Sequence, residues 1–295
     1  MNYFKTLFFI IFPIFLISCS SSYKELSNNT YKFDNNFSMY LNEAYKKKAD
    51  FEALKMHDWN SAKLYSEKAL KAVNGSNIYP EKLNNWKIPK EHIFELQLSH
   101  KNLMNIYEEA ILADPYNLAI AISSLDCWAE QQEENWQVWD IQNCRNDFLK
   151  AIHKIYNSLD KDNNKKLIHN NKSKKNISVV TKDDENKILQ IVYFDFDKSN
   201  LSNININEIE KFIKTFKNQI NQYIITGHTD TVGSNNYNYK LSIERATEVK
   251  KILIKLGIDK DNINILGKSE NDLKIKTGNN IAHPANRRAE IGLLN

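Results

Sequence analysis

The sequence of 295 residues contains only seven glycines, and this scarcity limits the sites that it can build. Neither GxGxxG nor GxxxxGK[S/T] occurs, so the glycine-rich loops that cradle nucleotide phosphates are missing. The sequence also lacks the HExxH zinc motif, and no nucleophile beside a paired base is evident. We therefore expect a protein that is not an enzyme and that uses no cofactor and no metal.

The chain also lacks a strong excess of one charge. Its formal net charge is +4, with acidic and basic residues interspersed. A protein that binds nucleic acid would need basic side chains clustered on one face, so we expect no nucleic acid partner.

No apolar run is long enough for a permanent membrane span. Residues 7–17 are almost wholly apolar, but as a helix they rise only about 16 Å against a hydrocarbon layer of about 30 Å. A basic residue, Lys5, precedes this run, and the two together are typical of a secretory signal peptide. The sequence therefore predicts export, with a retained membrane helix as the less favoured alternative.

The apolar run ends in Leu16-Ile17-Ser18-Cys19, which resembles the lipobox of bacterial lipoproteins. The resemblance implies a signal peptide over residues 1–18, cleavage before Cys19, and acyl chains such as palmitate on Cys19. Two or three acyl chains anchor stably, because each buried methylene contributes about 0.8 kcal/mol. By the usual sorting rule, Ser20 in place of Asp favours the periplasmic face of the outer membrane. A plain signal peptide with an incidental cysteine is the alternative.

Two cysteines remain, Cys127 and Cys144, an even pair in an oxidising compartment. On one straight helix they would lie about 25 Å apart, whereas a disulfide requires alpha-carbons within about 7 Å. If they pair, the chain must reverse between them, and we expect the reversal near residues 134–138.

Three segments precede the C-terminal third of the chain. Residues 19–37 are polar without apolar periodicity and are predicted to be a flexible tether. Residues 38–159 carry helical periodicity throughout, and helices are expected near residues 59–73, 91–113, 117–134 and 139–159. Residues 160–187, rich in Lys and Asn, are a linker by composition.

The helical domain over residues 38–159 is predicted to be all-α. Its part 44–70 resembles a single tetratricopeptide-type helix pair, with Ala62 and Ala69 spaced like the small residues of that repeat. An ordinary helical bundle stays the alternative, since such repeats need about three copies for stability. The apolar stripes include Trp59 and Phe94. We expect the glutamates of segment 126–136 to form a solvated face.

The last segment, residues 188–295, alternates strand and helix signals. Strands are predicted near residues 191–196, 222–226, 262–266 and 288–294, and helices near 206–216 and 237–256. The order βαβαββ predicts a sheet covered by two helices, so the whole chain is α+β.

Several motifs follow one another in this segment. They are Tyr193-Phe194-Asp195-Phe196-Asp197, Gly227-His228-Thr229-Asp230, Tyr237-Asn238-x-x-Leu241-Ser242-x-x-Arg245-Ala246 and Asn286-Arg287-Arg288. In this order they resemble the OmpA-like peptidoglycan-binding domain family. One departure is the segment 268–272, where the family often has an aromatic residue and glycine; we expect this loop to lie away from the central motif.

The resemblance implies non-catalytic binding of the diaminopimelate in peptidoglycan stem peptides. The free end of this group carries an ammonium and a carboxylate on one carbon. Asp230 would receive the ammonium, and Arg245 would form a fork onto the carboxylate. Further candidate site residues are Phe194, Asp195, Thr229, Asn238, Leu241 and Arg287, although Phe194 and Leu241 fit core packing equally well.

These features favour a tether between the outer membrane and the wall, held by lipid on Cys19 and by peptidoglycan at the other end. An adaptor whose helical domain recruits an envelope protein partner is the alternative. Trp128, Trp136 and Trp139 would then form an exposed aromatic patch. A motor stator subunit, which shares the C-terminal domain, would require a real membrane helix.

Overall fold

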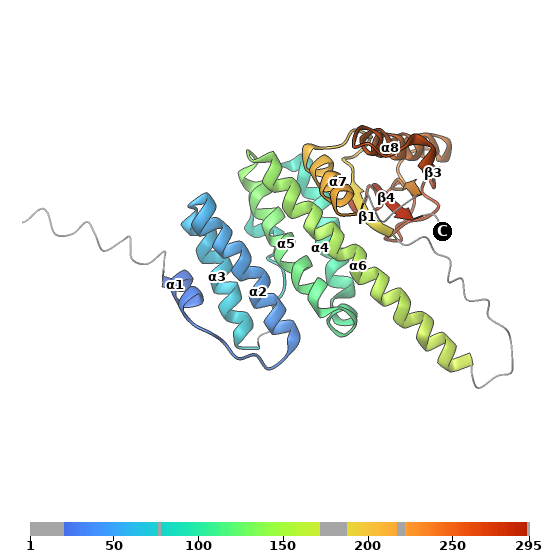
Figure 1. The fold of residues 1–295 in the computed structure, drawn as a ribbon. Coiled ribbons are helices and arrows are strands. Elements are labelled where there is room, and N and C mark those ends of the chain that lie inside the picture. Colours follow the sequence, from blue (N-terminus) through green and yellow to red (C-terminus); the bar gives the residue numbers. More distant parts are fainter. Residues whose placement is uncertain (1–20, 76–77, 172–187, 217–221, 294–295) are drawn as a thin grey trace, which may run out of the picture.

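The computed structural model describes residues 21–75, 78–171, 188–216 and 222–293 (Figure 1). The predicted signal peptide, Cys19 and residues 172–187 lie outside the described residues. Among the helices of the described ranges, none combines the length and the apolar character needed to cross a membrane. Figure 1 shows a helical part and a smaller part with a sheet, so the predicted α+β class is confirmed.

The helical part contains six α-helices within the described ranges. They are α1 (Ser21–Asn28), α2 (Asn36–Phe51), α3 (Trp59–Val73), α4 (Lys90–Ala113), α5 (Pro115–Glu134) and α6 (Val138–Asn171), with the short turns η1 (Glu52–Met56) and η2 (Leu83–Asn85). Asp58 caps α3, because its carboxylate accepts from the backbone N–H groups of Asn60 and Ser61. Pro115 fits the first turn of α5, where its missing N–H is not needed.

The predicted tether is partly wrong, because residues 21–28 form α1. Leu26 is buried in the helical core, and the hydroxyl of Tyr23 donates to Asp50 Oδ1 at 2.9 Å. A single buried leucine leaves no periodicity for the sequence to reveal. The predicted linker is also too long at its start, since α6 continues to Asn171. No glycine or proline interrupts residues 138–171, so nothing in the backbone ends the helix earlier.

The predicted apolar stripes are wrong in two places and the solvated face in one. Trp59 is 41% exposed and Phe94 is also exposed, while Leu96 faces the core in place of Phe94. Glu130 is buried, whereas Glu133 is half-buried and Glu134 is exposed, so the predicted solvated face of glutamates is wrong at Glu130. The reason is that α5 lies at the centre of the helical part and packs against α2, α4 and α6.

A buried charge pair lies between α3 and α5. The ammonium of Lys68 contacts the carboxylate of Asp126, which also accepts from the Tyr45 hydroxyl at 2.6 Å and the Glu81 backbone N–H at 2.6 Å. Removing one partner of such a pair costs about 3–5 kcal/mol, because the other charge is left buried alone. This network therefore fixes how α2 and α3 dock on α5.

A disulfide between Cys127 and Cys144 joins α5 to α6, with the alpha-carbons 5.6 Å apart. The chain reverses at residues 135–137, within the segment where the sequence predicts a reversal. Asn135 ends α5 in the left-handed conformation, at φ 52°. The tight turn thus brings two cysteines 17 positions apart onto facing helices.

The sheet part confirms the predicted βαβαββ order. Its elements are β1 (Ile188–Tyr193), α7 (Asn203–Phe216), β2 (Tyr223–Gly227), α8 (Asn235–Lys255), β3 (Ile263–Gly267) and β4 (Arg288–Leu293), with short turns η3 (Lys260–Asn262) and η4 (Pro284–Asn286). The strands are ordered β1-β4-β2-β3, with β4 antiparallel to β1 and β2, and β2 parallel to β3. One apolar core joins this sheet to α7 and α8. Gly227 is required there, because a Cβ atom would lie 1.9 Å from the Ser242 carbonyl oxygen of α8.

The other side of β1 packs against the helical part. Tyr193 belongs to the helical core, and its hydroxyl donates to the Leu149 carbonyl of α6 at 3.0 Å. Ile275 and Ala285, from the segment between β3 and β4, join the same core. Figure 1 shows α6 passing beside β1, so the two parts share an apolar interface.

Candidate functional site

The motif segments of the sheet part meet at one edge of the sheet. Because β4 is antiparallel to β1 and β2, its first residue lies beside their last residues. The loop after β2 carries Thr229 and Asp230, and the loop after β1 begins at Phe194. Arg245 projects from α8, and Arg287 directly precedes β4.

Arg245 is fully buried at this edge. Its Nη1 donates to the His228 carbonyl at 2.8 Å and its Nε to the Lys198 carbonyl at 2.9 Å, while Nη2 lies 3.4 Å from the Asp195 carbonyl. The guanidinium also lies 5.2 Å from the centre of the Phe194 ring. Burial, aided by the charge of Arg287, lowers the pKa of Arg245 to about 9.

Asp230 lies in the same cluster but does not pair directly with Arg245. Its Oδ2 is 3.4 Å from Nη1 of Arg287, and its Oδ1 accepts from the Val232 backbone N–H at 3.3 Å. Burial raises the pKa of Asp230, and the charges of Arg287 and Arg245 oppose this rise. The structure thus brings Asp230 and Arg245 together, with Arg287 as the direct partner of Asp230.

The other candidate residues surround these charges. Thr229, Asn238, Leu241 and Phe194 are buried, whereas the Asp195 side chain is half exposed. The Thr229 hydroxyl is buried without a hydrogen-bond partner among the described residues. The amide of Asn238 donates to the Asp230 carbonyl at 3.4 Å.

The loop after β3 contacts the central motif, so the expectation that it lies away is wrong. The Ser269 carbonyl accepts from the Thr229 backbone N–H at 3.0 Å, and Glu270 accepts from the amide of Asn238. The reason is the parallel pairing of β2 and β3, which places the loops that follow them side by side.

The helical part contributes two charged residues that the sequence analysis missed. Glu95 of α4 bonds through Oε1 to Nη2 of Arg287 at 3.0 Å and to Nη2 of Arg145 at 2.9 Å. Arg145 of α6 also lies 3.7 Å from Asp195 and 3.4 Å from the Phe194 carbonyl. Although burial opposes it, the charges of Arg145 and Arg287 lower the pKa of Glu95 to about 2. Helical periodicity carried no signal for these contacts, because they join residues up to 192 positions apart.

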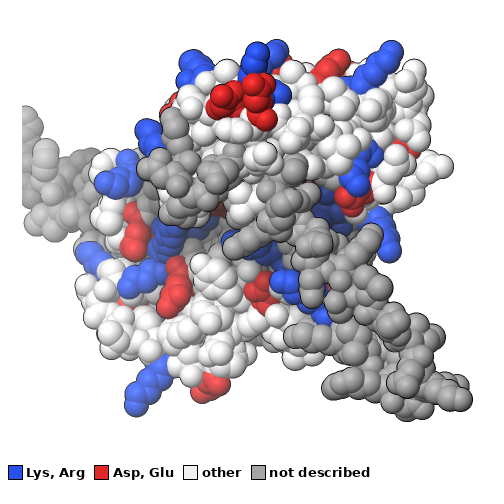
Figure 2. All heavy atoms as spheres, turned by 45° about the vertical axis from the view of Figure 1, so that its right-hand side comes forward, with Lys and Arg blue, Asp and Glu red and all other residues white. Residues whose placement is uncertain are grey.

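One face of the molecule shows charges of both signs. On the face drawn in Figure 2, Lys and Arg side chains alternate with Asp and Glu side chains. This face therefore offers no extended basic surface of the kind that tracks a nucleic acid backbone.

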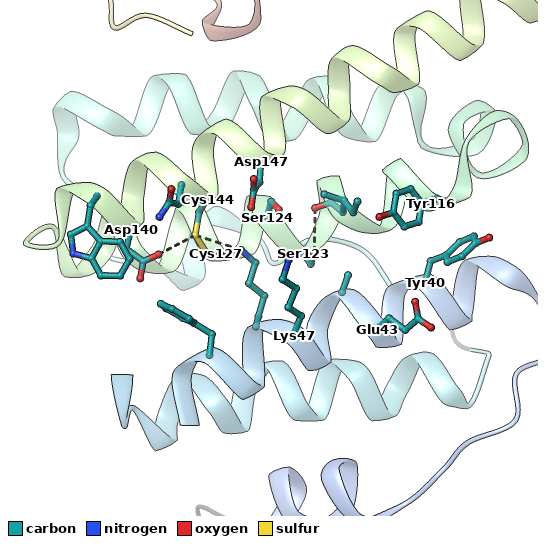
Figure 3. Close-up of a pocket in the computed structure, with 16 residues that line it drawn as sticks. Tyr40, Glu43, Lys47, Tyr116, Ser123, Ser124, Cys127, Asp140, Cys144 and Asp147 are labelled. Carbon is teal, nitrogen blue, oxygen red and sulfur yellow. Dashed lines mark hydrogen bonds between the residues drawn. A yellow bond between two sulfur atoms is a disulfide. The ribbon is translucent and has the colours of Figure 1, made fainter. Parts of the chain in front are cut away.

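A cavity lies in the helical part, between α2, α5 and α6 (Figure 3). This cavity has a volume of about 540 Å³, and residues from all three helices line it, including Tyr40, Lys47, Tyr116, Trp139 and Asp147. Trp139 and Trp136 are 46% and 70% exposed, but Trp128 is buried. The patch of three exposed tryptophans required by the adaptor hypothesis is therefore reduced to two.

Comparisons with known proteins include a family match within the sheet part. Residues 193–287 match the model of the OmpA family. Outer membrane porin F of Pseudomonas fluorescens is 33% identical over 107 residues, which cover 35% of this chain and 32% of the porin. The peptidoglycan-associated lipoprotein of Buchnera aphidicola subsp. Baizongia pistaciae is 27% identical over 130 residues, covering 41% of this chain and 74% of that lipoprotein.

Among solved structures, the OmpA-like domain of FopA1 from Francisella tularensis subsp. tularensis SCHU S4 is 26% identical. The alignment covers 34% of this chain and 68% of that one, with a TM-score of 0.31. The chain spans about a third of the length of the porin F relatives. The helical part up to Asn171 lies outside the family match.

The lowered pKa of Glu95 predicts a pH dependence of stability. A carboxylate whose pKa falls on folding stabilises the fold above its unfolded pKa of about 4.3, and this contribution is lost as the pH falls toward 2. We expect Glu95→Gln to lower the free energy of unfolding at neutral pH, with a difference from wild type that shrinks between about pH 4 and 2. Urea unfolding at stepped pH measures this. Glu91→Gln, which changes an exposed side chain of the same helix, is the control. The prediction would be contradicted if the free energy of unfolding changed with pH to the same extent in wild type and in Glu95→Gln.

Proposed function

We propose that this protein, whose residues 193–287 form an OmpA family domain, is a non-catalytic anchor that binds peptidoglycan. The finer proposal is that Asp230 and Arg245 bind the ammonium and the carboxylate at the free end of diaminopimelate in the stem peptide. The observation that carries it is the buried cluster of Asp230, Arg245 and Arg287, which provides both signs of charge within one site.

The cluster retains unused hydrogen-bonding capacity, which supports a ligand. A guanidinium has five N–H groups, and Arg245 directs hydrogen bonds to three carbonyls, of which the 3.4 Å contact to Asp195 is long. A carboxylate accepts about four hydrogen bonds, and Asp230 accepts two long ones. The unpartnered hydroxyl of Thr229 adds a further polar group beside Asp230.

A ligand reaches these groups in our proposal by displacing the segment 195–198. The carbonyls of Asp195 and Lys198 cover Arg245, while the side chains of this segment are exposed. A hydrogen bond from the Tyr237 hydroxyl of α8 to the Asp197 carboxylate joins this segment to α8. A ligand carboxylate in place of these carbonyls would pair opposite charges and could accept two parallel hydrogen bonds from the guanidinium, which separate carbonyls do not offer.

The proposed affinity for one stem peptide is modest. Each charged hydrogen bond contributes about 1.5–3 kcal/mol, and the entropy lost on binding offsets part of this. Many copies on one continuous polymer would still hold firmly through avidity.

The wall-binding proposal predicts the behaviour of two variants. Asp230→Ala and Arg245→Ala should each abolish co-sedimentation of the full chain with purified sacculi, because each removes one of the two charges that bind diaminopimelate in this proposal. Glu244→Ala and Lys240→Ala remove the same charges from exposed neighbours on α8 and should sediment like wild type. Circular dichroism confirms that each variant is folded. Undiminished sedimentation of both site variants would refute the site assignment.

We further propose that acyl chains on Cys19 anchor the protein on the periplasmic face of the outer membrane. The support is the motif Leu16-Ile17-Ser18-Cys19 together with Ser20. The Buchnera aphidicola relative is named as a lipoprotein that is associated with peptidoglycan, and the alignment covers 74% of its length.

Mass spectrometry tests this anchor. The mature chain should begin at Cys19 and carry the mass of its acyl chains, and Cys19→Ser should leave the signal segment uncleaved and the protein unacylated. Detection of a wild-type chain that begins elsewhere and carries no lipid would contradict the anchor while leaving wall binding untouched.

A second candidate function is an adaptor that places a protein partner at the wall. The observation that favours it is the cavity of about 540 Å³ in the helical part, whose lining contains the exposed Trp139 and side chains of both charges. Figure 3 shows the charged residues Glu43, Lys47, Asp140 and Asp147 in this lining. Concave sites lined by aromatic side chains and a few polar groups are where ligands and peptides usually bind.

Photo-crosslinking in cells tests the adaptor function. A photoreactive residue in place of Tyr116, which lines the cavity, should form a defined adduct with an envelope protein. The same residue in place of the exposed Leu112 of α4 is the control and should not form it. The adduct should also disappear when Lys47→Glu reverses a charge of the lining. Equal adducts at both positions would argue against a partner in the cavity.

A further inference from the structure

Five carboxylates gather where the turn between α2 and α3 meets the end of α5. Asp58 caps α3, Glu130 and Glu134 lie one helical turn apart on α5, Glu52 begins the turn η1, and Asp140 lies in the first turn of α6. The carboxylate oxygens of Asp58, Glu130 and Glu134 can all lie within 4.8 Å of one another. This distance fits ligands of one hard cation, since oxygens bound to Ca²⁺ at about 2.3–2.6 Å lie up to about 5 Å apart.

Three of these carboxylates have no cationic partner in the described chain, whereas the charge of Lys48 acts on Glu52 and Asp140. Among the described residues, none of the ion pairs involves Asp58, Glu130 or Glu134. Glu52 is only 2% exposed. A buried carboxylate that faces like charges needs either a proton or a cation.

Unpartnered oxygens beside the cluster point to a ligand. Gln131, 2% exposed, donates through Nε2 to Glu130 at 2.9 Å, which holds its amide against the cluster, yet its carbonyl oxygen Oε1 has no hydrogen-bond partner in the described chain. Asp140, 4% exposed, likewise has a buried Oδ2 without a partner there, and its charge acts on Glu52. Buried polar atoms are rarely left unsatisfied, and amide and carboxylate oxygens are the ligands that Ca²⁺ prefers.

We propose that Asp58, Glu130 and Glu134 bind a divalent cation, calcium by preference, with the buried Oε1 of Gln131 completing the site. The cation would join the end of α5 to the turn that connects α2 and α3, so its role is structural. The proposed ligands come from positions 58 and 130–134 and match no spacing motif, so the proposal differs from the expectation of no metal drawn from the sequence. The site lies in the helical part and is independent of the proposed wall binding.

Terbium luminescence tests this site on the full chain in detergent micelles. Tb³⁺ is a luminescent substitute for Ca²⁺. The indole of Trp136 lies within hydrogen-bonding reach of Glu134, so it can transfer excitation energy to an ion bound there. We expect saturable Tb³⁺ luminescence under tryptophan excitation, displaced by Ca²⁺ at lower concentration than by Mg²⁺, because Ca²⁺ tolerates irregular oxygen shells.

Two variants and a matched control locate the binding. Glu134→Gln changes an exposed side chain, and Asp58→Asn keeps the cap of α3, so both should fold. Each should weaken Tb³⁺ binding by about 10- to 100-fold or more, since loss of outer partners alone has this effect. Glu133→Gln, the adjacent position on α5, should bind like wild type.

Thermal unfolding gives the second measurement. Calcium should raise the Tm of wild type and of Glu133→Gln, because it binds only the folded site, and should leave the Tm of Glu134→Gln unchanged. The proposal is overturned if wild type shows no saturable luminescence. It is equally overturned if Glu134→Gln and Asp58→Asn bind Tb³⁺ as tightly as Glu133→Gln, which would place the ion elsewhere.

Discussion

The arrangement of the helical part and the sheet part depends on the hydrogen bonds and ion pairs that the guanidinium of Arg287 makes. This guanidinium is buried, and its N–H groups reach the Phe194 carbonyl at 3.1 Å, Asp230 at 3.4 Å and Glu95 at 3.0 Å. These acceptors come from the end of β1, the loop after β2 and helix α4. A buried arginine must satisfy its donors, so the sheet part retains this geometry only while α4 supplies Glu95. The site therefore extends beyond the family domain into the helical part.

Three buried clusters of charged residues differ in whether opposite charges of the chain balance them. Lys68 with Asp126, and Glu95 with its two arginines, are balanced by opposite charges within the chain. The three carboxylates of the proposed cation site have no such partner in the described chain. The first two clusters need nothing from outside, whereas the third needs protons or a cation. Burial alone does not indicate function; the difference lies in whether the chain supplies the compensating charge.

Local and short-range features of the fold were predictable from the sequence, and contacts between distant segments were not. Asp58 as the cap of α3 and Pro115 in the first turn of α5 act within a few residues. The strand and helix signals predicted the βαβαββ order, and the family motifs pointed to Asp230 and Arg245 as site candidates. The helix over residues 21–28 escaped prediction because it is held by tertiary contacts of Leu26. Glu95 escaped because its partner Arg287 lies 192 positions away and no periodicity links them.

The shared interface also determines how load would pass through the proposed tether. Tension between a lipid on Cys19 and a wall-bound Asp230 would enter the helical part at α1, where Leu26 and the Tyr23–Asp50 hydrogen bond resist peeling. It would pass to the sheet part through the non-covalent contacts of α4 and α6, which include the Glu95–Arg287 pair and the hydrogen bond from Tyr193 to the Leu149 carbonyl. Because Arg287 also bonds to Asp230, this interface and the proposed binding site would resist tension together.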